Sequence, residues 1–329
     1  MTTEKRDLHG VEKPSTPEEP LRKTVLATFV SMCLWVLMIC SIAGFFSFAH
    51  WTFDLFNHFR SNALIASVLL CCLAYLFNRR LLGLAVAITC LNGVVLVPAL
   101  QRVDFVPELA DTQEAGETIT VVFANVLTSN DEYDKTIDVL TRDDPDIIAL
   151  SEVNNRWVGA LEQLEQTYPY TIPYPRSDNF GMAVYSKLPF NSALEPFGLY
   201  GIPLGKLDFG EYQLAIGHPV VPRSLANVQD NWAYIEALGE FAKESDKPTV
   251  IVGDLNSTVF SPAMDPLLTD GIHKVSTGLL SYTWPIFLPV LGLQLDHIFE
   301  RGIPAAQGEL LDEIGSDHYP VRVRFVLHN

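Results

Sequence analysis

The chain has 329 residues, 48% of them hydrophobic, and its 22 Lys+Arg against 39 Asp+Glu give a formal net charge of −17 at pH 7. All five cysteines lie between residues 33 and 90, which excludes a disulfide framework or a cysteine-based zinc site from the rest of the chain. Residues 101–329 carry 14 Lys+Arg and 33 Asp+Glu, a net of −19, which argues against tight binding to nucleic acid because that affinity comes largely from basic side chains.

Three apolar runs without a charged residue follow the first 20 residues. A helix needs roughly 20 apolar residues to cross a bilayer, so the runs predict a three-helix transmembrane anchor over residues 21–100. The second run is short, and its span is expected to include interfacial residues such as Phe56 or Phe59. A cleaved signal peptide is the alternative for the first run, and a buried helical hairpin for the other two. The runs lie at about 24–49, 62–77 and 81–100.

Basic residues in the short flanks predict the orientation of this anchor. Arg22 and Lys23 precede the first run, and Arg79 and Arg80 lie between the second and the third. The positive-inside rule then puts the N-terminus in the cytoplasm, including residues 1–20, which are polar and predict a disordered tail. Three crossings of an inner or plasma membrane leave everything beyond them periplasmic or extracellular.

A predicted linker at residues 101–117, rich in acids, leads to a region in which short β-branched runs alternate with helical stretches. This alternation predicts an α/β (α+β) fold over residues 118–329, a four-layer sandwich of two central β-sheets flanked by helices. Helices are expected at 131–142 and 231–243. Strands are expected at 118–126, 146–153, 181–187, 212–218, 248–256, 295–300 and 320–327.

Polar residues recur at the ends of these expected strands. Any one of them alone is more often a turn former or a cap, but all are Asn, Glu, Asp or His. Carboxylates without cysteine suit Mg²⁺ or Mn²⁺, and histidines beside carboxylates can transfer protons, so the set suits hydrolysis of a phosphate ester. The residues are Asn125, Glu152, His218, Asp254, Asn256, Asp296, His297, Asp317 and His318; for His297 a packing role is as compatible as a catalytic one.

The segments around these residues resemble the endonuclease/exonuclease/phosphatase superfamily, which includes deoxyribonuclease I, neutral sphingomyelinases and inositol polyphosphate 5-phosphatases. They occur in the family's order and cover about residues 118–325. They read "VVFANV", "DIIALSEV", "GMAVYSKLP", "AIGHP", "VIVGDLNST", "LDHIF" and "GSDHYPV".

The resemblance implies a metal site for Mg²⁺ or Mn²⁺. Glu152 would be the principal ligand, with Asn125 nearby and Asp317 as a further ligand. Relatives that act on abasic DNA carry an acidic residue two positions after the first Asn, where this chain has Leu127. A second carboxylate on this strand is therefore missing.

The resemblance also implies catalytic roles. Asp254 would orient or deprotonate the attacking water, and Asn256 would hold a phosphoryl oxygen. His318 would contact the phosphate or assist proton transfer, with Asp296 fixing its imidazole. His218 would stabilise the transition state or protonate the leaving oxygen.

Three further residues are candidates for substrate binding. Arg156 and Arg176 could pair with phosphate, although surface salt bridges are the alternative for both. Trp284 could stack on a lipid or a base, and its alternative is a core aromatic.

The predicted function is a divalent-metal-dependent phosphodiesterase or phosphatase held at a lipid bilayer. Its phosphoester substrate would be a lipid headgroup or another extracytoplasmic phosphate. The alternatives are a membrane-anchored nuclease of the deoxyribonuclease I type, acting on nucleic acid, and a binding module that has lost catalysis. No protein partner can be inferred.

Overall fold

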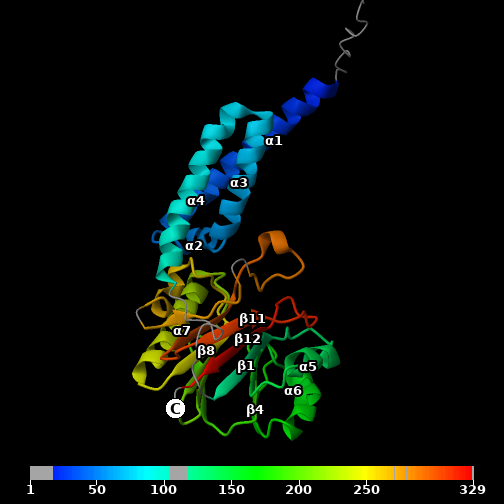
Figure 1. The fold of residues 1–329 in the computed structure, drawn as a ribbon, viewed down its shortest axis with the longest axis vertical. Coiled ribbons are helices and arrows are strands. Elements are labelled where there is room, and N and C mark those ends of the chain that lie inside the picture. Colours follow the sequence, from blue (N-terminus) through cyan, green and yellow to red (C-terminus); the bar gives the residue numbers. More distant parts are fainter. Residues whose placement is uncertain (1–17, 104–116, 270, 279–280, 328–329) are drawn as a thin grey trace, which may run out of the picture.

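A computed structural model of the protein describes residues 18–103, 117–269, 271–278 and 281–327. Four helices form an elongated bundle, called here the helical bundle (residues 18–103), which stands on a second, larger part of the chain (Figure 1). They are α1 (Glu18–Ala43), α2 (Trp51–His58), α3 (Arg60–Phe77) and α4 (Leu82–Arg102).

Three segments of the bundle are long and apolar enough to cross a membrane: Leu21–Phe46, Arg60–Phe77 and Arg79–Val97. They match the three apolar runs of the sequence. Helix α1 begins at Glu18, inside the stretch predicted as a tail, and α4 ends at Arg102, inside the predicted linker. The rest of both predictions, residues 1–17 and 104–116, lies outside the described residues.

The second part contains the two predicted β-sheets, each of six strands. One sheet has the order β11-β12-β1-β2-β4-β3, and the other has the order β5-β6-β7-β8-β10-β9. Each sheet mixes parallel and antiparallel pairs. In the first, β1 runs parallel to β2 and antiparallel to β12. In the second, β8 runs parallel to β7 and antiparallel to β10. The strands are β1 (Thr118–Asn125), β2 (Ile147–Ser151), β3 (Tyr170–Tyr174), β4 (Met182–Ser186), β5 (Asn191–Phe197), β6 (Ile202–Asp208), β7 (Gln213–Gly217), β8 (Thr249–Asp254), β9 (His273–Lys274), β10 (Asp296–Arg301), β11 (Ala306–Leu310) and β12 (Val321–Val326).

The alternation of side chains along each strand builds the predicted four layers. In β1, Val121 and Phe123 face the second sheet and join the core between the sheets. Val122 points the other way and packs under α5 (Tyr133–Thr141) and α6 (Asn155–Leu161). On the far side, α7 (Leu225–Glu244) covers β7 and β8.

The two sheets end in polar residues at one common edge. Parallel strands β7 and β8 both end there, and β10 begins there because Asp296 pairs with Asp254 in antiparallel register. In the other sheet, β1 ends at Asn125, and Glu152 directly follows β2. The fold therefore brings strand ends from both sheets together.

Candidate active site

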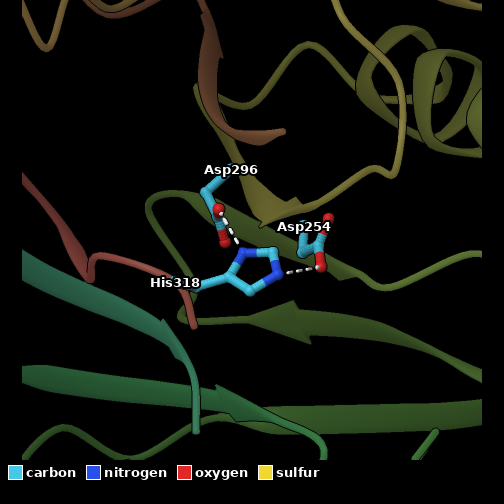
Figure 2. A group of neighbouring side chains, drawn as sticks. All are labelled: Asp254, Asp296 and His318. Carbon is cyan, nitrogen blue, oxygen red and sulfur yellow. Dashed lines mark hydrogen bonds and ion pairs between the residues drawn. The ribbon is translucent and has the colours of Figure 1, made fainter. Parts of the chain in front are cut away.

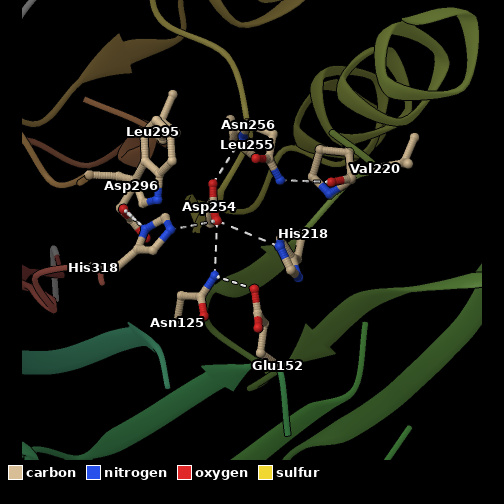
Figure 3. A network of polar contacts seen from close by, with 12 residues as sticks. Asn125, Glu152, His218, Val220, Asp254, Leu255, Asn256, Leu295, Asp296 and His318 are labelled. Atoms are coloured by element: carbon tan, nitrogen blue, oxygen red, sulfur yellow. Dashed lines mark hydrogen bonds and ion pairs between the residues drawn. The ribbon is translucent and has the colours of Figure 1, made fainter. Parts of the chain in front are cut away.

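Side chains from both sheets converge at this edge, as Figure 3 shows for Asn125, Glu152, His218, Asp254, Asn256, Asp296 and His318. Five of these side chains are buried. Buried polar groups are costly unless they are paired, so the pairing among them decides what the site can do.

Asn125 links the two sheets. Its Nδ2 donates to Glu152 Oε1 at 3.1 Å and to Asp254 Oδ2 at 3.0 Å, while its Oδ1 accepts the Leu127 N–H at 3.0 Å. The Thr128 N–H donates to Glu152 Oε2 at 3.2 Å. The Asn125 amide thus binds one carboxylate from each sheet. Glu152 Oε1 and Asp254 Oδ2 can therefore be no farther apart than the sum of these two hydrogen-bond lengths.

His318 lies between two buried carboxylates (Figure 2). Its Nδ1 is 2.7 Å from Asp296 Oδ2, and its Nε2 is 3.6 Å from Asp254 Oδ2. The backbone N–H of Asp296 donates to Thr283 Oγ1 at 3.0 Å, and the N–H of His318 donates to Ser316 Oγ at 3.2 Å. The imidazole is therefore fixed in orientation, with one nitrogen facing Asp254.

The charges of this group reinforce one another. Burial alone would lower the pKa of His318, but Asp296 and Asp254 outweigh it and raise that pKa to about 10. Burial alone would raise the pKa of Asp254, but His318 and His218 outweigh it and hold that pKa below its usual value. Burial raises the pKa of Asp296. At neutral pH the geometry favours an ionised Asp254 facing a protonated imidazole.

His218 and Asn256 complete the cluster on the side of the second sheet. His218 Nε2 lies 3.5 Å from Asp254 Oδ2, and its Nδ1 is buried without a hydrogen-bond partner in the described part of the chain. The Asn256 N–H donates to Asp254 Oδ1 at 3.0 Å, and its Nδ2 donates to Pro219 O at 3.0 Å.

Two residues of the cluster have unusual backbones. Glu152 has a φ of 62° and Asn256 a φ of 51°, in the left-handed region that non-glycine residues rarely adopt. Such strain persists where the surroundings hold it and is common at functional sites. Close strand packing is also needed beside them, because a Cβ at Gly253 would lie 2.1 Å from Gly217 O.

The remaining predicted residues lie at the periphery. Asp317 Oδ2 accepts from Trp284 Nε1 at 2.9 Å, and the Trp284 ring lies 6.4 Å from that of His318. Arg156 is exposed, and its Nη2 donates to Thr128 O at 3.4 Å.

Arg176 is engaged within the protein. Its Nε donates to Asp178 at 2.8 Å, its Nη1 donates to Gly201 O at 2.8 Å, and it forms an ion pair with Asp178. It borders a pocket of about 390 Å³ that includes Asn154 and Asp178. The salt-bridge alternative is therefore present for Arg176.

A buried pair beside the site was not anticipated from the sequence. Lys274 Nζ lies 2.7 Å from His297 Nδ1, and His297 Nε2 lies 2.8 Å from Ser257 O. Burial lowers the pKa of His297 well below its usual value, so this histidine is neutral. His297 therefore supports the segment after Asp254 instead of facing the cluster. No local signal pairs Lys274 with it, because the contact depends on the pairing of β9 with β10.

Residues 122–318, more than half of the chain, match the family model described as the endonuclease/exonuclease/phosphatase family. The chain belongs to this family. Members of the family are phosphoester hydrolases. The resemblance seen in the sequence is thereby confirmed.

Solved structures share the fold of this endonuclease/exonuclease/phosphatase domain. A humanised D. rerio TDP2 with 14 mutations superposes with a TM-score of 0.53 at 18% identity, covering 64% of this chain and 99% of that one. A beta toxin from Staphylococcus aureus gives a TM-score of 0.50 at 17% identity, covering 62% and 99%. At these identities the likeness concerns the fold alone.

Curated relatives are more similar in sequence over a shorter stretch. A UPF0294 protein of Vibrio vulnificus (strain YJ016) is 27% identical over 131 residues, which is 36% of this chain and 44% of that protein. A UPF0294 protein of Vibrio cholerae serotype O1 (strain ATCC 39315) is 29% identical over 128 residues, 37% of this chain and 45% of that protein. The match thus spans less than half the length of these relatives.

The donor set of this family member fits a hard divalent cation. Glu152 and Asp254 both contact the Asn125 amide, and Asp254 and Asp296 lie with His318 in a group whose side-chain donor atoms are within 4.8 Å of one another, so carboxylates from both sheets gather at this edge. Asp296 Oδ1 is a buried acidic oxygen without a hydrogen-bond partner among the described residues. Oxygen ligands of this kind suit Mg²⁺ or Mn²⁺ more than the softer metals that cysteine binds.

Proposed function

We propose that this chain is a divalent-metal-dependent hydrolase of phosphoester bonds that acts on a substrate at a membrane surface. The observation that carries the proposal is the convergence of Glu152, Asp254 and His318 through direct contacts with Asn125 and Asp296. The carboxylate can accept a proton from water, and the oriented, charged imidazole beside it can stabilise the negative charge of a phosphate.

In the proposed reaction, Asp254 accepts a proton from the attacking water, because its lowered pKa keeps it ionised. The water oxygen bonds to phosphorus, and the bond from phosphorus to the leaving oxygen breaks. His218, beside Asp254, gives the proton that the leaving oxygen needs. His318 offers positive charge to the phosphoryl oxygens, and the Asn256 amide donates to one of them.

Glu152, Asn125 and Asp317 would hold the metal ion. A bound divalent cation would supply positive charge to the phosphoryl oxygens as negative charge develops there. The chain's own contribution is to hold Glu152 through Asn125 and Thr128 and to tether Asp317 to Trp284.

A lipid-side substrate is favoured by an apolar loop next to Trp284. Residues 286–291 contain no charged residue, and Phe287 and Val290 are 75% and 79% exposed. The Asn62 side chain, in the first turn of α3, donates to Val290 O at 3.0 Å. Because Arg60–Phe77 is one of the apolar spans, this loop sits at the end of a span, where a bilayer surface would cover it.

The test compares two substrates for the full chain in the presence of Mg²⁺. We expect the purified protein to hydrolyse the phosphoester of phospholipid headgroups in vesicles and to release the phosphorylated headgroup. The Asp254→Ala variant should release none. A matched control is Asp265→Ala, in a turn outside the cluster. Efficient nicking of plasmid DNA by the wild type, lost in Asp254→Ala, would replace the lipid assignment with the nuclease alternative. Activity on neither substrate would contradict the proposed function and favour a binding module.

A further inference from the structure

Helix α2 lies between the apolar helices and the second part of the chain (Figure 1). It buries its polar side chains Asp54, Asn57 and His58, while Leu55 and Phe56 are exposed. A helix normally buries its apolar stripe, so this inverted pattern needs a polar partner. The partner is the catalytic loop, defined here as residues 255–261, which directly follows Asp254.

We propose that α2 is a positioning element for this loop. Through Asp54 and His58 it makes the geometry of the cluster around Asp254 depend on the helical bundle. The catalytic consequence rests on the proposed function, whereas the ordering of the loop does not.

Two side chains of α2 reach the catalytic loop. His58 Nδ1 accepts the Thr258 N–H at 3.1 Å and lies 3.2 Å from Thr258 Oγ1. Asp54 Oδ2 accepts from Ser261 Oγ at 2.6 Å. Since His58 Nδ1 accepts a backbone N–H, its ring is neutral with the proton on Nε2. The side chains of Asp54, His58, Thr258 and Ser261 are all buried, so water does not compete freely for the groups that form these hydrogen bonds.

The same contact continues into the bundle. Asn57 Nδ2 donates to Asp54 Oδ1 at 2.9 Å, and Arg60 Nε donates to Asn57 Oδ1 at 3.1 Å. Arg60 Nη1 then donates to Ser41 O in α1 at 2.7 Å, and Asn92 of α4 donates to Ser41 Oγ at 2.8 Å. Since Arg60 is the first residue of α3, an unbroken series of polar contacts connects all three apolar helices with Ser261.

The bundle leaves room for this series at Gly44. A Cβ on Gly44 would lie 2.3 Å from Arg60 Nη2 and 2.5 Å from Asn57 Oδ1. Both atoms are fixed by hydrogen bonds in a buried site, so they have little freedom to move aside.

The opposite side of the catalytic loop is held by the second part of the chain. His297 Nε2 donates to Ser257 O at 2.8 Å, and Asn231 Nδ2 donates to Leu255 O at 3.2 Å. Asn256 lies between these contacts and those from α2, with its φ of 51°. A residue in this conformation keeps its place when both sides of the loop are held. Loss of the hydrogen bonds from α2 is therefore expected to increase the mobility of Asn256. It should also increase the mobility of Asp254 Oδ1, which accepts the Asn256 N–H.

The test uses the full chain in detergent micelles with Mg²⁺ and the soluble ester bis(p-nitrophenyl) phosphate, so that access to a lipid surface plays no part. The variants are Asp54→Ala, Ser261→Ala and their combination. We expect kcat to fall by about tenfold to a hundredfold in each single variant with KM unchanged, since a misplacement of about 1 Å can cost about 10²-fold. The double variant should be no slower than the slower of the two single variants, because both substitutions remove the Asp54–Ser261 bond. Thr52→Ala, on the face of α2 that carries the exposed Leu55 and Phe56, should retain wild-type kcat.

Hydrogen–deuterium exchange of residues 255–262 in the same samples reports the loop itself. Uptake should rise in Asp54→Ala and Ser261→Ala and remain at the wild-type level in Thr52→Ala. If Asp54→Ala does not fold, the comparison of Ser261→Ala with the wild type provides the test. Unchanged uptake together with unchanged kcat would overturn the inference. If the wild type does not cleave the ester, the proposed function fails for this substrate, and unchanged uptake in the variants would still overturn the positioning role.

Discussion

Replacing Lys274 by Met removes a buried amine with little change in side-chain length. Lys274 is 5% exposed, its Nζ lies 2.7 Å from His297 Nδ1, and it lies 5.0 Å from the centroid of the Phe299 ring. His297 stays neutral because burial lowers its pKa. The amine is therefore the titrating group of this pair at and above neutral pH.

The size of the effect follows from the pKa of this amine. Burial lowers the pKa of Lys274 from its ordinary 10.5 to about 7. In the unfolded chain the amine keeps its proton up to its ordinary pKa, so above pH 7 the unfolded state binds more protons than the native state. The free energy of unfolding of the wild type therefore rises with pH between 7 and 10.5, by about 2 kcal/mol from pH 7 to pH 9.

The assay is urea unfolding of the full chain in detergent micelles, followed by tryptophan fluorescence at pH 7 and pH 9. We expect the wild type to gain about 2 kcal/mol relative to Lys274→Met over this interval. The comparison between the two proteins cancels the titration of all other groups. A constant difference between them, or a wild type that loses stability relative to the variant, would refute a buried Lys274 amine with a lowered pKa.

Three further predictions concern the cluster and its rim. Asp296→Asn removes the carboxylate 2.7 Å from His318 Nδ1, and we expect kcat to fall by about 10²–10⁴-fold with KM little changed; a wild-type kcat would contradict its role. Phe287→Asp, in the exposed apolar loop, should reduce hydrolysis of vesicle lipid and leave that of a soluble ester unchanged, whereas equal losses on both would argue for damage to the site. Arg176→Ala should lower the melting temperature without raising KM, because this side chain is bonded to Asp178 and Gly201, and the exposed Arg156→Ala should raise KM; the opposite pattern would reverse the two assignments.

The sequence predicted those strands in which the pattern of apolar residues matches the side chains that the fold buries. The strand at 118–126 alternates inward and outward residues, and the structure has β1 at Thr118–Asn125. Strands β3, β5, β6, β9 and β11 were not predicted, and two of them, β5 and β11, show the physical reason. The former contains Pro196 and exposed polar residues, and the latter contains Gly308, so neither has the apolar run of a buried strand. Each owes its place to pairing with a neighbouring strand.

Helix α2 was missed for a related reason. Its aromatic residues suggested an interfacial loop, and its buried face is polar, which is the reverse of an amphipathic helix that packs on a core. Only the tertiary contact of Asp54 and His58 with the catalytic loop explains that pattern.

The polar residues of the site were recognisable one by one, and the family resemblance implied the pairing of Asp296 with His318. The pairings made through Asn125 were not predicted. Asn125 was expected near a metal, and the structure shows its amide between Glu152 and Asp254. The positive φ of Glu152 has no sequence signal, because glutamate does not favour that conformation. Such features arise where strands of two sheets meet, which local patterns do not encode.

The central claim is tested most directly by an Mg²⁺ titration of bis(p-nitrophenyl) phosphate hydrolysis by the full chain, with Glu152→Gln and Asp254→Asn as variants. Glu152 and Asp254 are bridged by one amide, so both substitutions keep the shape of the site and remove one charge each. We predict Mg²⁺-dependent activity in the wild type, a higher Mg²⁺ requirement in Glu152→Gln, and a lost kcat at all Mg²⁺ concentrations in Asp254→Asn. Full activity in a chelator, or full activity of Asp254→Asn, would contradict the account.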